Sequence, residues 1–131
     1  MEIIGRKIYV DLPELNGFAI PAKIDTGAFR TAVHCENIEV VRVGETELLH
    51  ATLKWTEKIH SFTFDKFQKR TIKNSFGQTE ERYCVRTLLI MRGKKIRSEI
   101  SFSSRTEMRY PILIGRKTLG KKFLIDVSKG F

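Results

Sequence analysis

Two segments decide the fold that this sequence predicts: Ala22-Lys23-Ile24-Asp25-Thr26-Gly27-Ala28 and, later, Tyr110-Pro111-Ile112-Leu113-Ile114-Gly115-Arg116. The first is a strand-like run that leads directly into Asp-Thr-Gly, and the second is an apolar run that ends in Gly-Arg. Asp-Thr-Gly alone is typical of an ordinary turn or helix cap. Both segments in this order, in a small chain rich in strand-forming residues, indicate instead that the Asp25 loop has a chemical role.

Peptide hydrolysis by paired carboxylates accounts for each residue of this loop. One carboxylate activates a water and the other, protonated, donates to the substrate carbonyl; two carboxylates about 3 Å apart share one proton. Asp25 would supply one carboxylate, and the Thr26 hydroxyl would bond across to an opposing loop. Gly27 allows close backbone approach and offers its N–H to the carboxylate, and Ala28 leaves room for a substrate backbone.

The sequence contains a single Asp-Thr-Gly and no second copy of the motif. A carboxylate pair therefore requires two chains that each donate Asp25 across a two-fold axis, the commonest oligomer symmetry. A length of 131 residues fits one domain. We predict a homodimer in which residues 1–131 form a single domain.

Short alternating runs rich in Val, Ile, Thr, Phe and Tyr predict that most of the chain forms strands. Turns are expected at 15–17, 43–45, 74–77 and 92–94, and a short helix at 116–122. The sequence thus predicts an all-β domain with one short helix near the C-terminus. The expected strands are 3–11, 18–24, 38–43, 47–54, 61–65, 68–73, 82–91, 95–102, 112–114 and 123–127.

Composition excludes several classes of protein. With 41% hydrophobic and 30% charged residues, the chain is not of the disordered type. No run approaches the ~20 apolar residues that span a bilayer, and the first residues lack a signal-peptide core, so we expect a cytoplasmic protein without membrane contact. Two cysteines and three scattered histidines show no metal-ligand spacing, so neither a metal nor another cofactor is expected. Adjacent His34 and Cys35 would point to opposite faces of a strand and cannot form a nucleophile pair.

Positive charge is concentrated in the last third of the chain. The whole chain has 24 Lys+Arg against 15 Asp+Glu, a net charge of +9. Between residues 92 and 122 the only acidic residues are Glu99 and Glu107. This composition fits solvated strand faces, and it equally fits a surface that attracts nucleic acid or a glutamate-rich polypeptide.

Further blocks follow the same order as in a known family. Residues 4–6, 12–15, 22–28, 32–35, 70–77, 81–82, 108–116, 119 and 123–127 together resemble the bacterial retropepsin-like aspartic peptidases, formerly labelled ATP-dependent zinc proteases. The resemblance covers nearly the whole chain. It implies a retropepsin-like closed β-barrel, with Asp25 as the catalytic residue and Thr26 and Gly27 as its support. It gives no support for zinc.

The resemblance also implies a substrate and a partner. Members of this family accompany ATP-grasp ligases of the RimK type, which add glutamates to a ribosomal protein, so the expected substrate is a glutamate-rich tail. The hairpin tip at 74–79 is expected to fold over the substrate as a flap, with a plain turn as the alternative. The expected substrate contacts are Ala28, Arg70, Lys73, Ser75, Gly77, Arg82 and Arg116.

One position departs from the pattern of retroviral relatives. They carry an acidic residue where this chain has Phe29, and it pairs with the arginine that corresponds to Arg116. Arg116 must therefore either tie down the Asp25 loop through another partner or bind a carboxylate of the substrate.

Two other classes of function remain open. The first is a non-catalytic module with this fold that docks on the ligase or on a ribosomal protein. The second is a basic β-barrel that binds RNA, which would place aromatic side chains on an exposed face. Nucleic acid is the less favoured partner, because Phe62, Phe64, Phe67, Phe102 and Phe123 lie in alternating runs typical of core strands.

Overall fold

The computed structural model describes residues 1–73, 76–104 and 108–131. No helix in these ranges has the length and apolar character needed to cross a membrane. The elements are, in order, β1 (Glu2–Ile4), β2 (Lys7–Leu12), a 3-10 turn η1 (Pro13–Leu15), β3 (Gly17–Ile24), β4 (Thr31–His34), β5 (Asn37–Val43), β6 (Thr46–Trp55), β7 (Lys58–Phe64), β8 (Gln68–Lys73), β9 (Thr79–Met91), β10 (Lys94–Ser103), β11 (Ile112–Ile114), α1 (Arg116–Leu119) and β12 (Phe123–Ile125).

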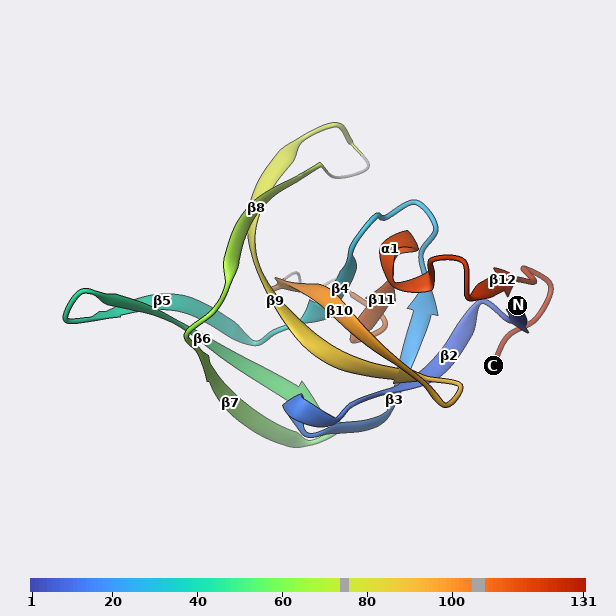
Figure 1. Cartoon of the computed structure of the whole chain (residues 1–131), viewed down its shortest axis with the longest axis horizontal. Coiled ribbons are helices and arrows are strands. Elements are labelled where there is room, and N and C mark those ends of the chain that lie inside the picture. Colours follow the sequence, from blue (N-terminus) through green and yellow to red (C-terminus); the bar gives the residue numbers. More distant parts are fainter. Residues whose placement is uncertain (74–75, 105–107) are drawn as a thin grey trace.

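Six strands close into a barrel at the centre of the fold. Their order is β10-β4-β11-β3-β2-β9, and β9 pairs back onto β10 (Figure 1). The short strand β11 lies between β3 and β4, parallel to β3 and antiparallel to β4. This insertion places the second apolar segment of the sequence directly beside the Asp25 segment. Over the described residues, the predicted all-β closed barrel with one short α-helix near the C-terminus is confirmed.

Alternation of apolar and polar residues explains the core. Val10, Leu12, Leu89 and Ile112 are fully buried inside the barrel, while their neighbours along each strand are more exposed. The five phenylalanines expected in the core bury as predicted: Phe102 and Phe123 are buried, and Phe62, Phe64 and Phe67 pack partly buried against the core.

Three further sheet segments extend from the barrel (Figure 1). Strands β5, β6 and β7 form an antiparallel sheet. Strand β8 pairs with the first half of β9 and forms a hairpin that projects from the barrel. Strands β1 and β12 pair in parallel and bring residues near the two chain ends together.

Some element boundaries differ from the sequence prediction for identifiable reasons. The expected strand 3–11 divides at Gly5-Arg6, because the C-terminal segment packs there and Lys129 accepts a hydrogen bond from the Arg6 N–H at 2.9 Å. The helix ends at Leu119, not 122, because Gly120 adopts a positive φ of 53°. Strand β4 was not among the expected strands, and it exists through its pairing with β10 and β11.

Candidate active site

Asp25 follows directly after β3, where that strand ends. Its backbone N–H donates to the Ile114 carbonyl in β11 at 2.9 Å, and the preceding Ile24 N–H donates to the Arg6 carbonyl at 2.8 Å. The chain then turns, because the Ala28 N–H donates to the Asp25 carbonyl at 3.2 Å. Backbone pairing therefore fixes the position of Asp25.

The loop itself orients the Asp25 carboxylate. The Gly27 N–H donates to Oδ1 of Asp25 at 3.1 Å, which confirms the bond predicted from the sequence. A methyl group on Gly27 would lie 3.3 Å from the same oxygen, so glycine leaves the carboxylate room. Thr26 and Gly27 are exposed. The expected bond from Thr26 to an opposing loop involves a second chain and stays a prediction.

Arg116 ties down the Asp25 loop. Its Nη1 donates to the Thr26 carbonyl at 2.8 Å, and its backbone N–H donates to the Ala28 carbonyl at 2.9 Å. Its guanidinium also lies 5.8 Å from the centre of the exposed Phe29 ring. Of the two roles considered for Arg116, the geometry supports that of tying down the loop through a partner other than an acidic residue at position 29. A contact with substrate stays a prediction.

Gly115 is the point of closest approach between β11 and the segment after the loop. A Cβ at this position would lie 2.5 Å from the carbonyl carbon and oxygen of Arg30. The Gly115 N–H donates to Oγ1 of Thr31 at 3.1 Å, and that hydroxyl is 2.6 Å from the Thr118 hydroxyl. Ser98 extends the buried chain of hydroxyls, with Oγ 2.7 Å from Thr118 Oγ1. The loop is thus supported by a glycine contact and a buried hydroxyl network.

Glu99 is a buried carboxylate beside this loop that sequence reasoning did not identify. Its side chain is 6% exposed, and it accepts hydrogen bonds from Arg30 and Arg70. Burial alone would raise the pKa of Glu99, but the hydrogen bonds from Arg70 and Arg30 outweigh burial and hold the pKa below its ordinary value. The available signal was a lone acidic residue inside the otherwise uncharged run 98–103.

Four of the remaining predicted substrate residues lie along the β8–β9 hairpin, namely Arg70, Lys73, Gly77 and Arg82. Arg70 and Arg82 face each other across the two strands, and Arg82 forms an ion pair with Glu80. Lys73 and Gly77 are exposed near the tip, where Gly77 has a positive φ of 81° that suits a turn. Ser75 lies outside the described residues. The structure thus places the other four residues on one hairpin, and contact of all five with substrate stays a prediction.

Both cysteines are free thiols buried in the structure. Burial raises the pKa of both Cys35 and Cys84 to about 11, so neither is an activated thiolate. His34 lies partly buried at the end of β4, and Cys35 next to it is 1% exposed. In the described ranges, no group of three or more His, Cys, Asp or Glu side chains is placed to hold a metal ion.

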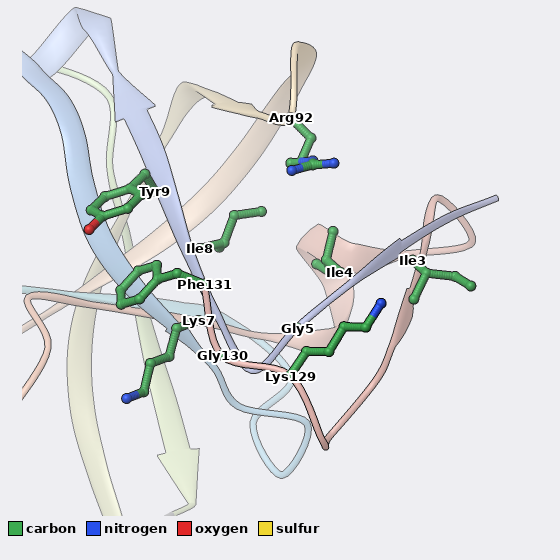
Figure 2. A pocket seen from close by; sticks show the side chains of 10 residues that line it. All are labelled: Ile3, Ile4, Gly5, Lys7, Ile8, Tyr9, Arg92, Lys129, Gly130 and Phe131. Carbon is green, nitrogen blue, oxygen red and sulfur yellow. The ribbon is translucent and has the colours of Figure 1, made fainter.

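A cavity of about 370 Å³ lies away from this loop, between β1, β2 and the C-terminal residues (Figure 2). Tyr9 and Phe131 stack there with ring centres 4.5 Å apart, and Lys7 Nζ lies 6.0 Å from the Phe131 ring. No residue of the Asp25 loop lines this cavity. Its lining residues are Ile3, Ile4, Gly5, Lys7, Ile8, Tyr9, Arg92, Lys129, Gly130 and Phe131.

A six-stranded closed barrel, with Asp-Thr-Gly at the end of one strand and an apolar strand ending in Gly-Arg beside it, defines the retropepsin-like class. Residues 3–131 match the RimB-like family, described as "Retropepsin-like aspartic endopeptidase RimB". The chain belongs to this family, which confirms the family predicted from the sequence.

One solved structure and several curated proteins are similar to this chain. A protein of unknown function from Legionella pneumophila has a crystal structure that superposes with a TM-score of 0.78 at 21% identity, over 99% of this chain and 96% of that one. Proteins named "Probable alpha-L-glutamate ligase" from Shewanella pealeana and Desulfotalea psychrophila are each 31% identical, over 98% and 95% of this chain. The chain spans 29% and 28% of the length of these two relatives.

Proposed function

We propose that this chain is an aspartic endopeptidase whose active site contains one Asp25 from each of two copies. The observation that carries this proposal is the geometry of the Asp25 loop. The Gly27 N–H orients the carboxylate at 3.1 Å, and Arg116 fixes the loop through the Thr26 carbonyl at 2.8 Å. The exposed Thr26 and Gly27 leave this edge of the loop accessible to a second copy.

The proposed reaction is hydrolysis by a carboxylate pair that holds one proton. The ionised Asp25 takes a proton from a water molecule while the water oxygen bonds to the carbonyl carbon of the substrate. The protonated Asp25 of the other copy donates its proton to the carbonyl oxygen, giving a tetrahedral intermediate. Transfer of a proton to the amide nitrogen then breaks the C–N bond and releases an amine and a carboxylic acid.

We further propose that the substrate is a glutamate-rich peptide, cleaved in the cytoplasm. The net charge of +9 supports this choice, because a cationic surface raises the local concentration of an acidic polypeptide. The names of the relatives support it as well, since those proteins are described as glutamate ligases. A glutamate ligase is accordingly the proposed partner, and its product the proposed substrate.

Mass spectrometry of peptides incubated with the wild type and with Asp25→Asn tests the activity. The panel contains an oligoglutamate-tailed peptide, a matched oligoglutamine-tailed peptide and a generic mixture, from about pH 4 to about pH 8. We expect cleavage by the wild type alone, with preference for the glutamate tail. Analytical ultracentrifugation checks that the wild type and the Asp25→Asn variant are both dimeric. Absence of cleavage from a folded dimer would refute the proposed activity.

A second candidate is a non-catalytic module that docks on a ligase. It is favoured by one observation: in the relatives named as ligases, the matching region is less than a third of the protein. This candidate predicts that Asp25→Asn leaves ligase binding intact and that no peptide is cut. RNA binding stays the less favoured alternative, because the five phenylalanines of the alternating strands pack in or against the core; it predicts affinity that falls steeply with salt.

A further inference from the structure

Three cationic side chains from three separate segments of the chain converge on the buried carboxylate of Glu99 in β10. Arg30 follows the Asp25 loop, and its Nε donates to Oε1 at 3.1 Å. Arg70 lies in β8 and binds both oxygens, with Nη2 at 3.1 Å from Oε2. Lys117 in α1 places Nζ at 4.0 Å from Oε2. One carboxylate therefore contacts the hairpin, the segment after the loop and the helix.

The contact with Arg70 matters because of how β8 is attached. In the described sheets, β8 pairs with β9 alone, so its other edge has no strand beside it. The two-point bond from Arg70 to Glu99 links β8 to a barrel strand that is not its hydrogen-bonded neighbour. A guanidinium that binds both oxygens of a carboxylate fixes orientation as well as distance. Glu99 thus restrains the hairpin at a second point.

The contact with Arg30 continues toward the Asp25 loop. The Arg30 guanidinium also lies 5.4 Å from the centre of the Phe29 ring, and Lys117 Nζ lies 5.8 Å from the same ring. The Phe29 carbonyl accepts a hydrogen bond from the Lys117 N–H at 2.9 Å. Phe29 is separated from Asp25 by only three residues. Two of the three cations that contact Glu99, Arg30 and Lys117, therefore also lie against Phe29 at the end of the loop.

A buried ion pair contributes little net stability compared with apolar side chains of similar volume. What Glu99 provides is a fixed relative position for two arginines from distant parts of the chain. We infer that Glu99 is a positioning residue that couples the β8–β9 hairpin to the Asp25 loop, so that residues 68–73 of β8 and the Asp25 carboxylate keep a fixed relative position. This inference rests on the proposed peptidase function for its catalytic part only.

Hydrogen exchange of the free protein tests the coupling without any substrate. Glu99→Gln keeps the shape of the side chain and removes its charge. We expect amide exchange about tenfold faster or more in both 68–73 and 26–31, with the amides of β6 unchanged. Glu81→Gln is the matched control, because Glu81 is on the same hairpin and pairs with Lys69 at 3.0 Å, but is 62% exposed. Arg70→Gln should reproduce the effect from the other partner, and the double variant should add little.

Kinetics then distinguish positioning from simple support. With the glutamate-tailed peptide, Glu99→Gln should lower kcat/KM by about tenfold at a temperature where the variant is fully folded, and Glu81→Gln should not. Unchanged exchange in 68–73 and 26–31 would overturn the coupling. Faster exchange with unchanged kcat/KM would overturn the positioning role. If the wild type cuts no peptide, the peptidase proposal fails, and the exchange result alone decides the coupling.

Discussion

Replacing Gly115 by alanine would press a methyl group against the backbone beyond the Asp25 loop. The new Cβ would lie 2.5 Å from the carbonyl carbon and oxygen of Arg30 and 2.7 Å from the carbonyl oxygen of Phe29. Ordinary van der Waals contact begins near 3.4 Å, so the two segments would have to separate by roughly 1 Å. No flexible side chain can yield, because all the opposing atoms are backbone.

The cost follows from what this separation breaks. Moving the segments apart strains the Gly115 N–H bond to Thr31 Oγ1 at 3.1 Å and the Arg116 N–H bond to the Ala28 carbonyl at 2.9 Å. Overpacking costs about 1–3 kcal/mol, and each weakened hydrogen bond about 1 kcal/mol. We expect the free energy of unfolding to fall by about 3 kcal/mol and Tm by about 10 °C.

Urea unfolding followed by circular dichroism measures this change. Gly130→Ala is the control, because its Cβ would have no atom within 4 Å, and its free energy of unfolding should change by less than about 0.5 kcal/mol. If Gly115→Ala matched that control, the close approach would not constrain the loop, and the argument from Gly115 would be refuted.

Three further predictions concern Thr31, the two buried cysteines and Glu99. Thr31→Val removes the acceptor of the Gly115 N–H and should lower the free energy of unfolding by about 1–3 kcal/mol in urea titrations, whereas Thr31→Ser should recover most of it. Because burial raises the pKa of Cys35 and Cys84 to about 11, both should react with a thiol reagent near neutral pH far more slowly in the native protein than in urea; equal rates would contradict their burial. The pKa of Glu99 is lower in the folded chain than the ordinary 4.5, so its stabilising contribution is present at neutral pH and is lost as the pH falls below about 4.5. Acid titrations of stability should therefore be flatter for Glu99→Gln than for the wild type, and identical slopes would count against this ion pair.

The bond from the Gly27 N–H to the Asp25 carboxylate could be predicted because the strand-forming run, the carboxylate and the glycine are adjacent in the sequence. The apolar run before Gly115 was recognised by its own composition, although its pairing with β3 is a long-range contact. Burial of the five core phenylalanines followed from alternation for the same reason. When the environment of a residue is set by its neighbours in the chain, that environment can be predicted from the sequence.

The burial and ion pairs of Glu99 could not be predicted, because its partners lie in distant parts of the sequence. Its partners Arg30 and Arg70 are 69 and 29 positions away, and a charged residue in a strand is usually taken to face solvent. Strand β4 escaped prediction similarly, since a strand of four residues gains its hydrogen bonds from β10 and β11, which come much later in the chain. Long-range pairing decides both cases.

The late position of Arg116 has a consequence for the growing chain. Thr26 leaves the ribosome 90 residues before Arg116, whose side chain fixes its carbonyl. At about 5–20 residues per second, synthesis of that interval takes roughly 5–20 s. Throughout this time the loop lacks both the Ile114 carbonyl that holds Asp25 and the arginine that ties down the turn. The Asp25 carboxylate is therefore fixed in position only after residues 114 and 116 have been made, and an earlier nascent chain lacks the contacts that hold the loop.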